Sequence, residues 1–234
     1  SPLLAAFDDR LPFELTAGQR EVAATIEADL AESHPMHRLL QGDVGSGKTV
    51  VALRAMLRVV DAGGQAALLA PTEVLAAQHF RSITALLGPL AARGQLGGAD
   101  VATRVSLLTG SLRTAQRRRE LLDIVSGDAG IVVGTHALIQ ETVDFHDLAL
   151  VVVDEQHRFG VEQRAALAAK ARDGSRPHVL VMTATPIPRT VAMTVFGDVA
   201  VSTLTELPAG RAPITTHVVV RHEQPTHVAR VWQR

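Results

Sequence analysis

The stretch LLQGDVGSGKTVVAL, residues 39–53, determines the fold that we expect for this chain. Within it, Gly42 to Thr49 match the pattern G-x-x-x-x-G-K-[ST]. An apolar pair precedes this segment, and apolar residues at helical spacing follow it. Glycines let backbone N–H groups curl around a phosphate, and a helix N-terminus adds the positive end of its dipole. The stretch therefore predicts a strand, a phosphate-binding loop and a helix, with a nucleoside triphosphate as ligand.

Two side chains of this loop have predicted roles. The Lys48 ammonium is expected to reach the terminal phosphates, and the Thr49 hydroxyl is expected to hold Mg²⁺. We therefore predict a nucleoside triphosphate and Mg²⁺ as cofactors. The alternative interpretation is a glycine turn ahead of a core helix. The predicted nucleotide-binding positions of the loop are Gly42, Asp43, Val44, Gly45, Ser46, Gly47, Lys48 and Thr49.

The composition is that of a globular protein. Hydrophobic residues make up 47% of the 234 and charged residues 20%, which argues against disorder. No apolar run approaches the length of a membrane span and the start shows no signal-peptide pattern, so we expect a cytoplasmic protein without a membrane partner. The absence of cysteine excludes disulfides and thiolate zinc sites. Lysine plus arginine number 23 against 24 acidic residues, so any contact with DNA needs a local patch.

Apolar and helical patterns alternate along most of the chain. Continuous apolar runs such as LALVVV, residues 148–153, indicate strands covered on both faces. Repeated strand–helix units predict an α/β fold with a mostly parallel central sheet and helices on both faces. Residues 1–14 are expected to be an irregular lead-in. The predicted strands after the phosphate loop are 65–70, 105–109, 131–134, 148–153 and 178–182, and the predicted helices are 17–32, 73–87, 114–125 and 162–171.

The second informative stretch is VVVDEQH, residues 151–157. Asp154 follows a buried strand, so its carboxylate is expected at the carboxyl edge of the sheet, near Thr49. Mg²⁺ needs a second anionic contact there, and the adjacent Glu155 could polarise the attacking water. The alternative is a pair of acids making surface contacts at a strand end.

Two further stretches are expected beside the nucleotide. MTATPIPRT, residues 182–190, presents the hydroxyls of Thr183 and Thr185 at the same edge, where they could link the nucleotide to another surface. A capped turn before a helix explains this stretch about equally well. Upstream, the Gln19 amide can pair with both edges of adenine, with Phe13 nearby, although an ordinary exposed helix glutamine is the simpler alternative.

Candidate DNA contacts follow two other predicted strands. APTEVLAAQ, residues 70–78, and VVGTHALI, residues 132–139, place small polar groups at helix starts, which suit phosphate oxygens. Aromatic residues amount to only 3%, which favours contact with the DNA backbone over base stacking. The densest basic run is Arg113, Arg117, Arg118 and Arg119, and a solvated helix face explains it about as well as DNA does.

The composition of the sequence changes near its end. The segment PAGRAP, residues 208–213, contains two prolines and one glycine, which is typical of a linker. We therefore predict one nucleotide-binding domain over 1–207, followed over 208–234 by a linker and the start of a second domain. The chain is accordingly expected to be a fragment.

Taken together, GDVGSGKT, APTEVLAAQH, VVGTHALIQ, VVVDEQHRFGVEQR and MTATPIPRT resemble the first RecA-like motor domain of a superfamily 2 helicase, over about 11–234, and within it the RecG branch. RecG proteins are ATP-dependent double-stranded DNA translocases that reverse stalled forks and migrate Holliday junction branches. The transcription-repair coupling translocase shares HRFGV and TATPIPRT, but its acidic box is usually DEEH, whereas this chain has Gln156. That translocase remains an alternative, as does a nucleotide-gated binding module without turnover.

The resemblance implies roles for individual residues. Those implied at the nucleotide are Gln19 at adenine, Lys48 and Thr49 at the phosphates and metal, Asp154 at the metal, and Glu155 at the water, and we also place Phe13, near Gln19, among the predicted nucleotide-binding residues. Those implied for coupling are His157, Thr183 and Thr185, and those implied at the DNA backbone are Thr72, Thr135 and His136. The resemblance also implies a second motor domain with arginine fingers and an amino-terminal wedge domain in the full-length protein. The isolated chain is therefore expected to be nearly inactive.

Overall fold

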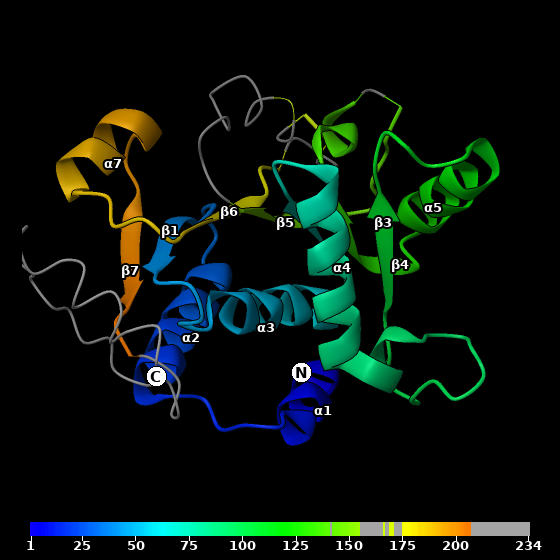
Figure 1. Cartoon of the computed structure of the whole chain (residues 1–234), viewed down its shortest axis with the longest axis horizontal. Helices are drawn as coiled ribbons and strands as arrows, with labels where there is room; N and C mark the ends of the chain where they lie inside the picture. Colours follow the sequence, from blue (N-terminus) through cyan, green and yellow to red (C-terminus); the bar gives the residue numbers. More distant parts are fainter. Residues whose placement is uncertain (141, 155–165, 167–168, 171–174, 207–234) are drawn as a thin grey trace, which may run out of the picture.

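The computed structural model describes residues 1–140, 142–154, 166, 169–170 and 175–206. Its strands form one seven-stranded sheet in the order β3-β4-β2-β5-β6-β1-β7, and every neighbouring pair is parallel (Figure 1). The predicted α/β fold of the RecA-like phosphate-loop class is confirmed. The strands are β1 (His37–Gly42), β2 (Gln65–Leu69), β3 (Arg104–Leu108), β4 (Ala129–Gly134), β5 (Leu148–Asp154), β6 (His178–Thr183) and β7 (Ala200–Leu204).

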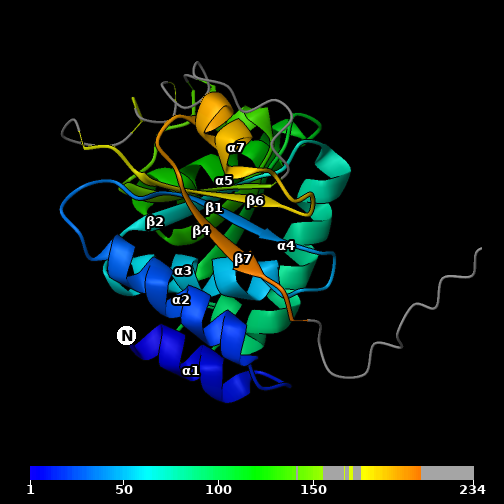
Figure 2. The same cartoon turned by 90° about the vertical axis from the view of Figure 1, so that its left-hand side faces the viewer.

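Helices cover both faces of this sheet. In Figure 2, α1, α2 and α3 lie below the strands, whereas α5 and α7 lie above them. The strands supply both cores, because Leu68 packs into the cluster beneath the sheet and its neighbours Ala67 and Leu69 pack into the opposite cluster. The helices of the described residues are α1 (Pro2–Arg10), α2 (Ala17–Leu30), α3 (Lys48–Asp61), α4 (Glu73–Leu87), α5 (Thr114–Ser126) and α7 (Arg189–Phe196), with short 3-10 turns η1 (Gly88–Ala91) and η2 (His136–Ile139). None of these helices is long and apolar enough to cross a membrane.

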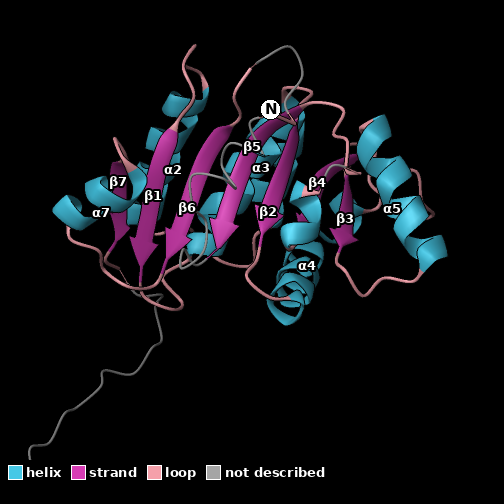
Figure 3. Ribbon diagram, turned by 90° about the horizontal axis from the view of Figure 1, so that it is seen from above, coloured by secondary structure: helices cyan, strands magenta, loops and turns pink. Residues whose placement is uncertain are grey.

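The parallel strands bring the loops of interest to one edge. Figure 3 shows the carboxyl ends of the strands at the same side of the sheet. The chain passes from β1 through α3 to β2, skipping the positions of β6 and β5, so the phosphate loop opens beside the ends of both skipped strands. This is the arrangement that the sequence pattern predicts for a ligand site.

The expectation of an irregular lead-in over 1–14 is wrong, because residues Pro2–Arg10 form α1. Proline is tolerated at the first helical position, where its missing N–H has no helical partner anyway. The side chain of Asp61, at the end of α3, accepts hydrogen bonds from the N–H groups of Leu3 and Leu4 at 2.9 and 3.0 Å. Both leucines are buried against α3, so a distant carboxylate and a hydrophobic contact stabilise this helix.

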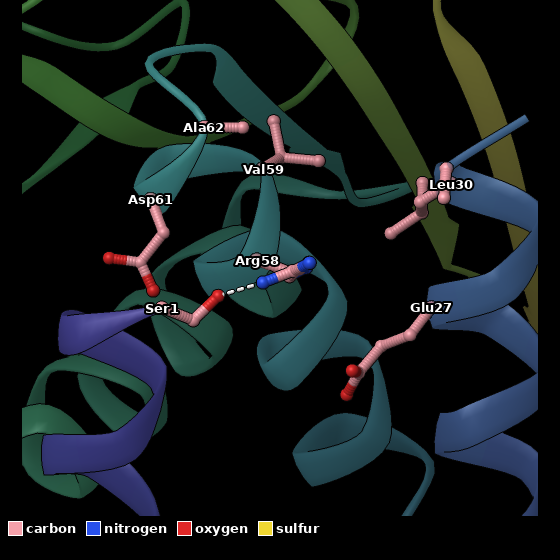
Figure 4. A pocket seen from close by; sticks show the side chains of 8 residues that line it. Ser1, Glu27, Leu30, Arg58, Val59, Asp61 and Ala62 are labelled. Carbon is pink, nitrogen blue, oxygen red and sulfur yellow. Dashed lines mark hydrogen bonds between the residues drawn. The ribbon is translucent and has the colours of Figure 1, made fainter. Parts of the chain in front are cut away.

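A cavity of about 390 Å³ lies where α1, α2 and α3 meet (Figure 4). Ser1 Oγ there accepts a hydrogen bond from Arg58, and Glu27 lines the opposite side. No residue predicted to bind nucleotide or DNA lines this cavity.

The last third of the chain agrees with the sequence predictions only in part. Strand β7 was not predicted and pairs with β1 at one end of the sheet, whereas helix α7 is the helix that the capped-turn interpretation of residues 182–190 expects. The predicted helix 162–171 lies largely outside the described residues, as does the segment 208–234 with its predicted linker. The division of the chain at 207 therefore stays a prediction.

Candidate functional site

A cavity of about 740 Å³ opens at the carboxyl edge of the sheet, next to the phosphate loop. It collects side chains from segments that are far apart in the sequence, including the start of α2, the start of α3 and the end of β5. Leu86 and Ala184 also line it, and neither was predicted, although Ala184 lies between two predicted threonines. The sequence-predicted residues that line this cavity are Phe13, Gln19, Val44, Gly45, Gly47, Lys48, Thr49 and Asp154.

The backbone of the phosphate loop depends on two glycines. Gly45 and Gly47 have φ angles of 83° and 89°, in the left-handed region that side chains disfavour. A Cβ atom on Gly47 would also collide with Nε2 of Gln19. Helix α3 begins directly after Gly47, so its N-terminus faces the loop. The glycine turn is thus built as a cradle at a helix start, as phosphate binding requires.

The Lys48 ammonium lies over this loop. Its Nζ donates hydrogen bonds to the carbonyl oxygens of Gly42 and Asp43, at 2.5 and 3.0 Å. A phosphate that approaches the loop therefore meets a positive charge that the backbone already holds in place. The neighbouring Thr49 lines the same cavity.

Gln19 is built into the site and is only 5% exposed. Its Nε2 donates to the carbonyl oxygen of Ser46 at 2.9 Å, and its Oε1 accepts from the N–H of Thr16 at 3.0 Å. The alternative of an ordinary exposed helix glutamine is therefore wrong. An amide has two N–H groups and two acceptor lone pairs, so each end keeps capacity for a base. Contact with adenine stays a prediction.

Glu206 supports the start of α2 from the end of β7. Hydrogen bonds from the Thr16 hydroxyl and from the N–H of Gly18, the latter at 3.2 Å, lower the pKa of the Glu206 carboxyl. Sequence reasoning missed this residue, because its partners lie almost the whole length of the chain away.

Asp154 ends β5 and points into the cavity, where the sequence predicts it. Its Oδ2 lies 2.5 Å from Nε2 of His79, a residue of α4, and the two side chains are 16% and 15% exposed. His79 was not predicted to belong to the site, although it directly follows the stretch at 70–78. The predicted catalytic residues Glu155 and His157 lie outside the described residues.

Thr183 and Thr185 form a tight turn after β6. The N–H of Thr185 donates to Thr183 Oγ1 at 3.1 Å, and Oε1 of Gln41 in β1 accepts from the N–H of Ile187 at 3.2 Å. This turn fits the capped-turn interpretation, and its middle residue lines the cavity. A coupling role for the two threonines stays a prediction.

The candidate DNA contacts follow two paired strands. Thr72 N-caps α4, with its hydroxyl accepting from Leu75 N at 3.2 Å, and Thr135 N-caps η2. Because β2 and β4 are parallel neighbours, these caps lie at the same edge of the sheet. Thr72 and His136 are exposed. On α5, Arg113, Arg118 and Arg119 are exposed while Arg117 hydrogen-bonds Gln140, which leaves both interpretations of that basic run open.

Comparison with known proteins agrees with this geometry. A family model described as DEAD/DEAH box helicase matches residues 16–194. The chain belongs to this family. Family membership implies nucleotide binding, which is consistent with the phosphate loop and Asp154 sharing one cavity.

Relatives of this DEAD/DEAH box helicase confirm the resemblance to RecG. The chain is 65% identical to the ATP-dependent DNA helicase RecG of Mycobacterium tuberculosis (strain ATCC 25618 / H37Rv), covering 96% of this chain and 30% of that protein. It is 61% identical to RecG of Mycobacterium leprae (strain TN), covering 99% of this chain and 31% of that protein. A solved structure of RecG bound to a three-way DNA junction matches with a TM-score of 0.81 at 38% identity, covering 99% and 29% of the two chains. The chain thus spans about 30% of the length of its curated relatives.

Proposed function

We propose that this chain is the ATP-binding motor domain of a RecG-type DNA helicase that translocates on double-stranded, branched DNA. One observation carries this proposal. The cavity at the carboxyl edge brings together the phosphate loop, Gln19 and Asp154, in a chain that is 65% identical to a RecG helicase.

The residues of the cavity fit ATP and Mg²⁺. A volume of about 740 Å³ lies within the range of ordinary small-molecule sites. Lys48 supplies a cation for the terminal phosphates, while Thr49 and Asp154 supply the oxygen ligands that Mg²⁺ prefers. When bound, the metal neutralises charge that develops on the phosphates during transfer.

Other residues have separate proposed roles in recognising the base, in hydrolysis and in coupling to DNA. Gln19 recognises the adenine edge, and Phe13, which is 47% exposed, covers the base. We propose that Glu155 orients the attacking water and that His157, Thr183 and Thr185 couple hydrolysis to DNA. A carboxylate in that position typically contributes a factor of about 10² to 10⁴ to the rate.

We propose further that Thr72, Thr135 and His136 contact the DNA backbone. Thr72 is exposed and Thr135 is half-buried, and both are N-caps whose hydroxyls stand beside backbone N–H groups, a combination that suits phosphate oxygens. The RecG relative of known structure is bound to a three-way DNA junction, which supports a branched substrate. Fork reversal and Holliday junction branch migration are the activities that we propose for the full-length protein, with a second RecA-like domain and an amino-terminal wedge domain.

We propose that the catalytic site is incomplete without the second motor domain. Arginine fingers in comparable enzymes raise turnover by a factor of about 10³ or more. Residues 1–234 should therefore hydrolyse ATP hardly at all, even with fork DNA, whereas a chain extended through the second motor domain should show DNA-stimulated hydrolysis. Steady-state ATPase assays of both proteins test this. Comparable turnover by residues 1–234 alone would show that the catalytic site is complete without a second domain.

A further inference from the structure

The contact between His79 and Asp154 joins two segments that the proposed function treats separately. His79 belongs to α4, whose N-cap Thr72 is a proposed DNA contact. Asp154 belongs to the nucleotide cavity as a proposed metal ligand. The imidazole Nε2 and the carboxylate Oδ2 lie 2.5 Å apart, across a sequence separation of 75 residues.

The pair His79 and Asp154 is shielded from solvent and has no competing side-chain partner among the described residues. Both side chains are mostly buried, at 15% and 16% exposure, so solvent screens the contact only partly. Within the described part of the chain, His79 is the single side chain that hydrogen-bonds Asp154. Because the hydrogen bond fixes Oδ2 of Asp154, it also fixes the direction of Oδ1. Partners that hydrogen-bond to metal ligands orient those ligands in the same way.

Helix α4 connects this contact to the proposed DNA surface. His79 follows Thr72 by seven residues, which is two helical turns and about 10 Å along the axis. Ala76, Ile83 and Leu87 bury one face of the helix in the core beneath the sheet, and His79 lies at the border of that face, one turn from both Ala76 and Ile83. Because an α-helix of this length moves as a unit, a shift at its N-terminus also moves His79.

We propose that His79 is a positioning residue that sets the orientation of Asp154 and thereby couples DNA contact at the start of α4 to metal-dependent nucleotide binding. This inference rests on the proposed function. His79 is not among the residues that line the nucleotide cavity, so its proposed effect there runs through Asp154. DNA would contact the start of α4, and the nucleotide with its metal would contact Asp154, which His79 of the same helix holds. Binding of DNA should therefore change the affinity for the nucleotide, and binding of the nucleotide should change the affinity for DNA by the same factor.

The test uses the full-length helicase at constant pH and a fluorescent ATP analogue. The first measurement is the ratio of the nucleotide affinity in Mg²⁺ to the nucleotide affinity in EDTA, which is the gain that the metal gives. His79→Leu should reduce that gain about tenfold or more, the usual cost of losing an outer-shell partner, and leave the affinity in EDTA unchanged. His79→Gln keeps an N–H donor and should retain most of the gain. Ser82→Ala, at an exposed position of α4, is the matched control and should behave as wild type.

Two further measurements separate positioning from a general structural effect. In an Asp154→Asn background, His79→Leu should add no further loss, because the group that it positions is already neutralised. In His79→Leu alone, fork DNA should lose its effect on nucleotide affinity, and the nucleotide should lose its effect on DNA affinity by the same factor. Circular dichroism and thermal melting identify any variant that fails to fold, and His79→Gln then serves as the test variant.

Three outcomes would overturn the inference. An unchanged Mg²⁺-dependent gain in His79→Leu refutes positioning, and an unchanged effect of DNA refutes coupling. An additive loss in the double variant shows that His79 acts elsewhere. If the wild type itself shows neither a gain from Mg²⁺ nor an effect of DNA, the proposed function fails instead, and the two failures are thereby distinguished.

Discussion

Gln19 Nε2 donates a hydrogen bond to the carbonyl oxygen of Ser46 at 2.9 Å, which joins the start of α2 to the phosphate loop. A Cβ on Gly47 would occupy the space of that amide, so the loop and the glutamine fit each other closely. The group proposed to recognise the base therefore also fixes the loop proposed to bind the phosphates. Loss of this side chain should affect both base selection and the conformation of the loop.

Gln19→Ala is expected to bring the affinities for ATP and GTP closer together and to lower the stability of the fold. The change leaves the buried Ser46 carbonyl without its partner, at a cost of about 1–3 kcal/mol. Competition titrations with both nucleotides, together with thermal melts, measure the two effects. Thr16→Ala removes the N-cap but keeps the amide, so it should lower stability without changing the ATP to GTP ratio. An unchanged ratio in Gln19→Ala would rule out recognition of adenine by this residue.

Asp61→Ala is expected to destabilise the protein by about 1 kcal/mol, the usual cost of losing a side chain that caps a helix. Its carboxylate accepts from the N–H groups of both Leu3 and Leu4. Asp61→Asn keeps one acceptor oxygen and should lose less. Urea unfolding of the three proteins measures the difference, and equal midpoints would mean that α1 is held by its apolar contacts alone.

Acid should weaken the fold through His178. Burial lowers the pKa of this imidazole below its ordinary value of 6.5, while the Asp29 carboxylate acts in the opposite direction. The neutral Nδ1 accepts from the N–H of Met36 at 2.8 Å, and protonation removes that acceptor. Since the folded pKa is lowered, this contribution to stability is complete above pH 6.5 and is lost as the pH falls through the lowered pKa.

The measurement for His178 is a series of melting temperatures between pH 7.5 and about 5. His178→Asn stays neutral throughout and should show a shallower fall than the wild type. His146→Asn, at an exposed position, is the matched control. A slope in His178→Asn as steep as that of the wild type would assign the acid sensitivity to other groups.

DNA binding by the full-length helicase should weaken steeply with salt and vary little with sequence. Contacts to phosphates release counterions, so log K falls linearly with log salt, with a slope of about −0.9 per phosphate on duplex DNA. Thr72→Ala should weaken binding equally on all sequences, whereas Thr72→Ser keeps the hydroxyl and should not. Anisotropy titrations on forks of unrelated sequence provide the comparison. A marked sequence preference at constant salt would contradict contact through the backbone.

The sequence predicts the parts of this molecule that depend on local pattern. The phosphate loop follows from glycine spacing, and strands such as β2 follow from apolar runs, because both faces of a covered sheet need apolar side chains. Interactions between distant segments are not encoded in local spacing. The capping of α1 by Asp61 and the pairing of His79 with Asp154 each join residues more than fifty positions apart. For the same reason the local pattern around Gln19 does not distinguish it from an exposed helix glutamine, because its partner Ser46 lies 27 positions away.

Calorimetric titration of ATP with Mg²⁺ measures whether this cavity binds the triphosphate through the phosphate loop. Lys48 Nζ is held over the loop by the carbonyl oxygens of Gly42 and Asp43. Lys48→Ala removes that charge and leaves the hydrophobic core untouched, so it should abolish most of the ATP affinity while the circular dichroism spectrum stays that of the wild type. Undiminished ATP binding by a normally folded Lys48→Ala protein would show that the phosphate loop is not the triphosphate site.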